Sequence, residues 1–502
     1  MVKKSAKIIF FTQSSIFPFL FNYIFRCLNC FSWELYQFGS IGGGSKFWNT
    51  LYKAGCELQD IEMIYKLNKD TKIIVETPSG KTEQAYVGDV VKQGTVLGPQ
   101  LCCVETDQIN KIGENQEKAV GEQIVGILIF VDDVMSAGTA DDIRKAIRNF
   151  SDMEQLKKFT YGLKKTNYMI IQTGREKDEI IVETVKNGVV QEVTEYKYLG
   201  IWVNKDGNCM LQIEKKKEQV KGQVSALISL ASYYNVGPLY VMMRLKLYEL
   251  CIVPSILYNL EGWNRLTKKE IEKLETIQHR TLCTLLQLPK TTPYIGLLSE
   301  LGMWRMEERM MYRKIMLFHN IMNSSDKRLC KQIIQEQIEN EEKETFYAET
   351  KMYCNKLRID IKELQDMLKS EVKRIVKEKI AERMVGVIHK SLHMTKLRFI
   401  CKPTKLEVKK YIEILSGTES LKTLKTRLNM QPVYGNYKGD ISKQRLCQYC
   451  NKEDDTTEHL LCCKTFGMEI AVDNLKNEDN AEVWRQINQL VDFNLKHRLE
   501  WV

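Results

Sequence analysis

Proline and glycine are scarce in this sequence, with 9 prolines and 28 glycines among 502 residues. So little proline argues against long disordered linkers and favours many helices. No motif recurs at the periods typical of solenoids, which excludes a repeat protein. Beyond the N-terminal segment, no stretch reaches the roughly 20 mainly apolar residues that a membrane span needs. A folded, helix-rich chain without a membrane span in its body is therefore expected.

The N-terminal segment is the one place where a membrane could enter. Lys3, Lys4 and Lys7 precede an apolar run from Ile8 to about Phe25, as in a signal peptide or anchor. Polar residues at 12–15 and 22 interrupt the run, and no small-residue cleavage site follows. We therefore expect no stable membrane association and treat 1–33 as an apolar segment of open status. A membrane-tethered helical protein stays as a minor alternative.

Charge and cysteine content limit which cellular compartment and which partners are expected for this protein. The net charge of +10 is consistent with a phosphate-backbone partner, but 74 positive residues face 64 negative ones, so most are expected to be solvated. The 15 cysteines are scattered, mostly in apolar stretches, which does not indicate a secreted disulfide framework. Reduced thiols in the nucleus or cytoplasm fit better.

Hydrophobic periodicity divides the chain into a mixed part and a helical part. A helix is expected from about Phe47 to Leu67, followed by a hairpin over 72–87. The run 126–130 predicts a strand that leads through an acidic turn into a second strand. From Leu211 to about Leu428 the pattern is almost wholly helical. An α+β body followed by a helical half indicates separate domains.

Asp132 and Asp133 follow the apolar strand directly. Burying carboxylates is costly unless they are paired, hydrogen-bonded or bound to metal. Mg²⁺ takes one or two carboxylates together with substrate phosphates, and two such ions can clamp a phosphoryl transfer. Considered alone, two adjacent aspartates are better explained by an ordinary hairpin turn.

Several motifs before and after this pair, in a particular order, make a functional interpretation of the pair more specific. Phe130-Val131-Asp132-Asp133 resembles the aromatic-x-Asp-Asp box of reverse transcriptases. Residues 91–99 resemble the family's Arg-Gln-Gly…Ser-Pro motif, and 162–166 resemble its Lys-Thr motif. Residues 196–200 resemble the Tyr-Leu-Gly hairpin of the primer grip. Together they resemble the non-LTR (LINE-type) retrotransposon branch, over roughly residues 34–330.

The resemblance implies an RNA-directed DNA polymerase, with an RNA template, a DNA primer or target and deoxynucleoside triphosphates as partners. It also implies a ribonucleoprotein in nucleus and cytoplasm. Asp132 and Asp133 are the implied ligands of Mg²⁺ or Mn²⁺ in the palm. The residues implied to contact template, nucleotide or primer are Lys92, Gln93, Gly94, Phe130, Lys165, Tyr198, Leu199 and Gly200.

The sequence departs from the family at its catalytic centre. The family's palm has a further Asp on an earlier strand, yet no Asp precedes Asp60 and Glu34 is the only acidic residue before Glu57. The expected region, Phe17 to Cys30, holds no carboxylate. Lys92 and Gly98 stand where the family has Arg and Ser. We therefore expect an impaired polymerase, or alternatively a non-catalytic nucleic-acid-binding remnant.

A second motif lies near the C-terminus. Cys447-x2-Cys450 and His459-x3-Cys463 have the spacing of a CCHC zinc site, with His459 on a short helix. Cys462 is an alternative fourth ligand, and unligated thiols are the bland alternative. The cluster resembles the zinc knuckle of non-LTR elements, which is thought to contact nucleic acid. His389-x3-His393 has no further partner nearby and is expected to be solvated.

The expected fold is α+β, with incomplete fingers and palm of a right-hand polymerase before an all-α thumb, a helical C-terminal half and a zinc knuckle. Lys215, Lys216, Lys217 and Lys221 suit either a helix against a duplex backbone or an ordinary surface helix. The expected divisions are the N-terminal segment 1–33, partial fingers and palm 34–205, thumb 206–330, connector 331–440, knuckle 441–470 and tail 471–502.

Overall fold

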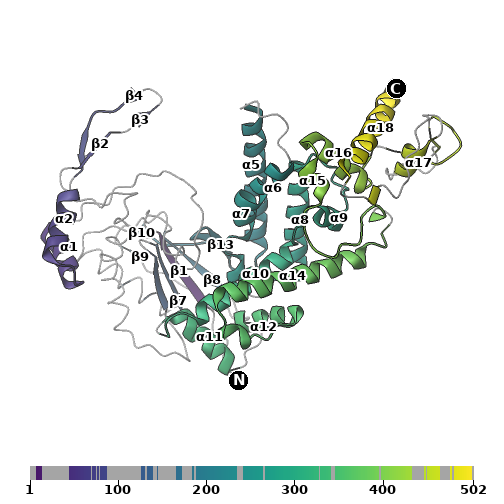
Figure 1. The fold of residues 1–502 in the computed structure, drawn as a ribbon. Helices are drawn as coiled ribbons and strands as arrows, with labels where there is room; N and C mark the ends of the chain where they lie inside the picture. Colours follow the sequence, from purple (N-terminus) through teal and green to yellow (C-terminus); the bar gives the residue numbers. More distant parts are fainter. Residues whose placement is uncertain are drawn as a thin grey trace. The chain divides into compact units, whose positions relative to one another are not determined.

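A computed structural model of the chain divides into two compact units, residues 1–211 and 212–502 (Figure 1). The first unit mixes helices and strands and the second is nearly all helical, so the broad α+β prediction is confirmed. The structure describes residues 7–13, 44–68, 71–74, 76–77, 80–87, 126–130, 133–138, 144, 148, 166–171, 184–185, 188–233, 241–263, 266–326, 328–340, 345–394, 397–431, 433, 446–447, 449–463, 475–476 and 480–499.

A five-stranded sheet organises the first unit, in the order β11-β8-β1-β7-β6. All neighbours are antiparallel except β11 and β8. The segment that resembled a signal peptide therefore supplies the middle strand of this sheet. Its apolar residues suit a strand flanked on both sides. The strands are β1 (Lys7–Gln13), β6 (Gly126–Phe130), β7 (Asp133–Gly138), β8 (Asn167–Ile171) and β11 (Gln191–Glu192).

Smaller elements complete the described part of this unit. The single helix expected from Phe47 to Leu67 is two helices, because Gly55 at φ +93° lies in the break between them. Leu51 packs against Ile61 and Ile64 across the pair. The hairpin expected over 72–87 is confirmed. These elements are α1 (Gly44–Lys53), α2 (Leu58–Asn68), β2 (Thr71–Ile73), β3 (Glu76–Thr77), β4 (Gly80–Lys81), β5 (Ala85–Val87), β9 (Thr184–Val185), β10 (Gly188–Val189), β12 (Glu195–Tyr198) and β13 (Ile201–Asn204).

The second unit is built from helices, as the periodicity predicted. Capping boxes begin two of them, with Thr267 paired to Glu270 and Ser416 paired to Glu419. The helices are α5 (Met210–Tyr233), α6 (Val241–Leu247), η3 (Tyr248–Ile252), α7 (Val253–Leu257), η4 (Leu260–Gly262), α8 (Lys268–Leu285), α9 (Tyr294–Glu300), α10 (Met306–Met322), α11 (Leu329–Glu339), α12 (Phe346–Leu357), α13 (Glu363–Asp366), α14 (Lys369–Ser391), α15 (Lys410–Ile414), α16 (Gly417–Arg427), α17 (Thr457–Cys462) and α18 (Ala481–Leu499).

The region expected to be a connector, residues 331–440, contributes to the core of this unit. Helices α12 and α14 pack on α10 (Figure 1). Val372, Val376 and Ile380 recur every four residues on α14, so one stripe of this charged helix is fully buried. Burying each such side chain stabilises by about 1.5–3 kcal/mol. Residues 346–391 are therefore part of the folded unit and do not act as a spacer.

A buried ion pair joins helices that are distant in sequence. Arg427 on α16 donates from Nε to a Glu300 oxygen at 2.6 Å, and both side chains are inaccessible to solvent. Tyr411 also donates to Glu300, at 2.9 Å, and Arg427 donates to the carbonyl of Leu475 at 2.7 Å. The guanidinium carbon lies 5.8 Å from the centre of the Trp484 ring on α18. The charge is thus fully paired inside the core.

The described helices bear on the alternative of a membrane-tethered protein. Within those parts of the chain, no helix combines the length and the apolar character that crossing a bilayer requires.

Candidate functional site

Asp133, the second residue of the acidic pair, belongs to a β-hairpin. In the β6–β7 pairing, Phe130 faces Asp133 and Ile129 faces Val134. The predicted strands on either side of the acidic turn are therefore confirmed, with Phe130 ending one and Asp133 beginning the other. Asp132 belongs to the two-residue connection, which lies outside the described residues.

The strand beside the hairpin carries no carboxylate. β1 pairs with β7 so that Gln13 faces Asp133 and Thr12 faces Val134. Its sequence, KIIFFTQ, contains an amide where the neighbouring strand has its aspartate. Residues 7–13 are thus a strand next to the acidic hairpin, and the expected region, Phe17 to Cys30, lies outside the described residues.

The Tyr-Leu-Gly motif turns the chain between β12 and β13. Tyr198 pairs with Ile201, which leaves Leu199 and Gly200 as the two turn residues, at φ +47° and +80°. Two positive φ values fit a type I′ hairpin turn, in which glycine is favoured and leucine is strained. The Tyr-Leu-Gly motif is therefore the turn of a hairpin, as the resemblance implied. Leu199 is buried, so its contacts offset part of the strain.

This second hairpin packs on the same sheet as the first. Tyr196 on β12 and Met169 on β8 are buried together, with Met135 of β7 and Tyr198 packed against them. The turn that resembles a primer grip and the strand that begins with Asp133 therefore share one small core. Five predicted site residues, Lys92, Gln93, Gly94, Asp132 and Lys165, lie outside the described residues, and their roles remain predictions.

The Cys–His group forms a closed cluster in the second unit. One ligand atom from each of Cys447, Cys450, His459 and Cys463 lies within 4.8 Å of all the others. The Cys447 and Cys463 sulfurs are 3.9 Å apart, and the Cys450 sulfur is 3.3 Å from His459 Nε2. Cys447, His459 and Cys463 are buried. These four side chains could hold one metal ion.

Local backbone geometry presents the first two cysteines. Leu446 and Asp454 form an isolated antiparallel bridge, and Cys447 N–H donates to the Glu453 carbonyl at 2.7 Å. Asn451 turns the chain at φ +50° and its N–H donates to the Cys447 carbonyl at 2.9 Å. Asparagine tolerates this left-handed conformation. The result is a tight knuckle with both thiols on its inner side.

The histidine is oriented by a helix and by a carboxylate. Thr456 caps α17 by accepting the His459 N–H at 3.2 Å. His459 Nδ1 lies 2.9 Å from a Glu453 oxygen, so Nδ1–H donates there and Nε2 is left as the acceptor that faces the thiols. Sequence reasoning missed Glu453, and the only signal was an acidic residue inside the Cys–His loop.

The thiols differ in their electrostatic surroundings. Burial raises the pKa of Cys447 to about 11. The backbone N–H groups of Lys452 and Glu453 lower the pKa of Cys450 to about 7. A divalent cation among the four side chains favours the thiolate at every position, because the metal replaces the proton.

The two adjacent cysteines, Cys462 and Cys463, make different contacts. Cys463 belongs to the cluster, whereas the Cys462 thiol donates to the Glu458 carbonyl at 3.1 Å. Of the two candidates for the fourth ligand, Cys463 is therefore the one that lies in the cluster. His389 and His393 each contact a backbone carbonyl, of Pro403 at 2.7 Å and of Lys390 at 2.7 Å.

The knuckle is fastened to the helical core. Thr457 donates to the Asn429 side-chain oxygen at 2.5 Å, and Arg398 forms an ion pair with Glu458. Asn429 follows α16, the helix that carries Arg427. The buried ion pair of the core and the metal-ligand cluster are thus linked through one short segment.

The lysines of α5 that could have faced a duplex are largely engaged in contacts within the chain. Lys217 pairs with Glu214 at 2.9 Å and Lys221 pairs with Glu218 at 2.8 Å. Lys216 is buried, with its ammonium 5.0 Å from the centre of the Tyr258 ring. These contacts favour the surface-helix interpretation over a duplex-binding helix.

Comparison with known proteins identifies no family for this chain. No family model matches the chain, and no curated protein matches it significantly. We therefore base the function on the residues and their geometry.

Proposed function

We propose that this chain is the reverse-transcriptase region of a non-LTR retrotransposon protein, an RNA-directed DNA polymerase with an impaired metal site. The observation that carries the proposal is the β6–β7 hairpin, which begins its second strand with Asp133 and is flanked by β1 in an antiparallel sheet. The Tyr-Leu-Gly turn, which packs on the same sheet, supports it. The expected partners are an RNA template, a DNA primer and deoxynucleoside triphosphates.

The donor set at the hairpin fits one divalent ion better than two. Asp132 and Asp133 supply two carboxylates, and the residue of β1 that faces Asp133 is Gln13. An amide oxygen is neutral, so it cannot replace a carboxylate that bridges two ions. Mg²⁺ or Mn²⁺ held there supplies charge neutralisation to the triphosphate. The chain's own residues would position the primer end, through Phe130 and the 198–200 turn.

Primer extension on a homopolymer RNA template tests this proposal. The parent chain is compared with Gln13→Asp, with Asp132→Ala and with the double variant. We expect weak or undetectable incorporation by the parent and at least about a hundredfold more by Gln13→Asp, because a restored ligand completes the site. Adding Asp132→Ala should remove that gain. If all four proteins incorporate equally little, the polymerase proposal is wrong.

The absent carboxylate favours a second candidate, a non-catalytic nucleic-acid-binding remnant of such an element. It predicts that the chain binds a primer–template duplex, that Asp132→Ala changes nothing, and that Gln13→Asp also fails to extend the primer. The extension experiment above therefore separates the two candidates when it is accompanied by a duplex-binding measurement.

For the Cys–His cluster we propose zinc as the ion. With zinc–sulfur bonds of about 2.3 Å and a zinc–nitrogen bond of about 2.0 Å, a tetrahedral site places its ligand atoms roughly 3.5–3.8 Å apart. The observed separations of 3.9 and 3.3 Å are close to these values. Four protein ligands leave no open position, so the ion has a structural role, and the knuckle would present its surface to nucleic acid.

A further inference from the structure

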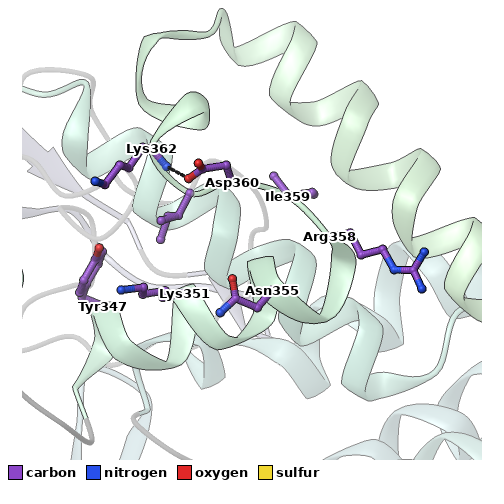
Figure 2. A pocket seen from close by; sticks show the side chains of 8 residues that line it. Tyr347, Lys351, Asn355, Arg358, Ile359, Asp360 and Lys362 are labelled. Carbon is purple, nitrogen blue, oxygen red and sulfur yellow. Dashed lines mark hydrogen bonds between the residues drawn. The ribbon is translucent and has the colours of Figure 1, made fainter.

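A cavity of about 450 Å³ lies against α12 and the segment that follows it, far in sequence from the acidic hairpin and from the Cys–His cluster (Figure 2). Its volume falls within the roughly 300–1,000 Å³ typical of small-ligand sites. The buried Ile359 and Ile361 contribute apolar lining. Tyr347 and Asn355 line it as well and come from α12. Neither the polymerase proposal nor the zinc proposal uses this site.

Positive charge dominates the lining. Lys351, Arg358 and Lys362 all line the cavity and are all exposed. Within the described parts of the chain, none of the three forms an ion pair, unlike Lys217 and Lys221 on α5. Exposed cations without an ion pair among the described residues favour an anionic ligand.

One carboxylate accompanies these cations. Asp360 lines the same cavity, and one of its oxygens accepts the backbone N–H of Lys362 at 2.9 Å (Figure 2). Its charge is therefore partly used in holding the local turn. Three cations against one carboxylate leave an excess of two positive charges at the cavity.

The cations lie at two ends of the site. Figure 2 shows the Lys351 and Lys362 ammonium groups on the same side as the Tyr347 hydroxyl, with Asn355 between them and Arg358, whose guanidinium points the other way. The Lys351 ammonium is 6.0 Å from the centre of the Tyr347 ring. Phe318 supports that ring from the core, with its own ring centre 6.0 Å away. Tyr347 is thus an aromatic side chain held between the core and a cation of the cavity lining.

The backbone at Arg358 is unusual. This residue is the C-cap of α12 and adopts the left-handed conformation, with φ +56° and ψ +46°. Glycine or asparagine is the common choice at such a cap, because a larger side chain is disfavoured there. A charged residue in a disfavoured conformation beside a cavity is a reason to look for a ligand.

We propose that this cavity binds single-stranded nucleic acid. A base lies against Tyr347, one phosphate contacts Lys351 and Lys362, and a neighbouring phosphate contacts Arg358. An aromatic ring flanked by cations is the usual arrangement for binding a single strand without sequence preference. A strand matches the two separated cationic ends because its phosphates repeat, whereas a single small anion can occupy only one of them.

Photo-crosslinking of the zinc-loaded full chain tests the location. An oligouridylate that carries 4-thiouridine is irradiated with the protein, and the modified peptides are identified by mass spectrometry. We expect crosslinks within 346–362, reduced by Tyr347→Leu and kept by Tyr347→Phe. Crosslinks confined to other segments overturn the proposal. This readout is independent of polymerase activity, so it can succeed where primer extension fails.

Binding measured by fluorescence anisotropy tests the chemistry. Lys351→Gln, Arg358→Asn and Lys362→Gln are combined in one variant, with asparagine chosen because it tolerates the left-handed backbone. Losing contacts to two phosphates should reduce the slope of log affinity against log salt concentration by roughly 1.4, which is about 0.7 for each phosphate of a single strand. Tyr347→Leu should weaken binding about tenfold, through lost stacking.

A matched control removes equal charge elsewhere. Lys369, Lys373 and Lys377 are exposed on α14 and do not line the cavity. Changing all three to glutamine should leave the salt dependence nearly unchanged. If this control loses as much affinity as the cavity variant, binding reflects net charge and the proposal is wrong. Equal displacement of the oligonucleotide by a polyglutamate peptide, which offers no base, also contradicts it.

Discussion

The acidic hairpin of the first unit and the Cys–His cluster of the second are both metal-site candidates, but they are built in opposite ways. The hairpin needs partners from strands far apart in the chain, since residues 7–13 lie beside residues 133–138. The cluster draws its four ligands from one short segment between Cys447 and Cys463. The first lacks a charged ligand at Gln13, and the second is complete. A locally encoded site can therefore keep its ligand set where a site assembled from distant strands does not.

The largest expected effect comes from breaking the complete site. Cys447→Ser removes a buried ligand, so we expect the bound zinc to fall from one ion per chain to none. Structural zinc in small knuckles contributes about 10–16 kcal/mol of apparent binding energy, and much of this stabilises the local fold. Metal analysis and limited proteolysis of residues 446–463 measure the change. Cys462→Ser is the matched control and should keep its zinc.

The next effect concerns the core to which the cluster is fastened. Glu300→Gln leaves the buried Arg427 without its partner, and breaking such a pair costs about 3–5 kcal/mol. Urea unfolding of the second unit should show this loss. The exposed pair of Arg374 and Glu378 offers the control, because Glu378→Gln should cost well under about 1 kcal/mol. Equal losses in the two variants would contradict the role given to the buried pair.

A smaller effect is expected from changing Glu453, the carboxylate that accepts a hydrogen bond from His459. Glu453→Gln keeps the size of the side chain but weakens the hold on His459 Nδ1. Changes of this kind usually lower metal affinity about 10- to 100-fold. Competition with a chromophoric zinc chelator measures it. Glu458→Gln, which removes the ion pair to Arg398 and not a contact to a ligand, should retain nearly the parent affinity.

The smallest effect is a pH dependence on α5. Hydrogen bonds from Lys273 and Lys217 lower the pKa of Glu214 to about 2, from an ordinary value of 4.5. A carboxyl whose folded pKa is depressed adds stability above its unfolded pKa and loses it as pH falls toward the folded pKa. We expect Glu214→Gln to cost about 0.5 kcal/mol at pH 6, since the group is solvent-screened. The difference from the parent should shrink between about pH 4.5 and 2. Urea unfolding across this range checks it, and a difference independent of pH would exclude the ion pairs as its source.

The sequence predicts those features that depend on residues close together in the chain. The Cys–His cluster, the place of Cys463 in it and the short helix at His459 all depend on spacing within a few residues, and each was predicted. The strands around the acidic pair and the helices after Leu211 were also found, because periodicity is a local signal.

Features that depend on distant pairing were missed. Residues 7–13 resembled the start of a signal peptide, since an apolar strand and an apolar targeting segment share one composition. Only the sheet register shows that Gln13 faces Asp133. The cavity at α12 was missed because residues 331–440 were expected to form a connector. Arg358 and Lys362 line the same cavity as Tyr347 only because the helix ends in a left-handed turn.

The central claim is that the carboxylates at the hairpin exist to bind divalent ions and that Gln13 is the defect in the site. Electron paramagnetic resonance of Mn²⁺, titrated into the zinc-loaded protein with primer–template and a non-reacting nucleotide, tests this most directly. We predict weak binding by the parent, at least about tenfold tighter binding by Gln13→Asp, and loss of that gain when Asp132→Ala is added. Identical Mn²⁺ affinity in all three proteins would contradict the account.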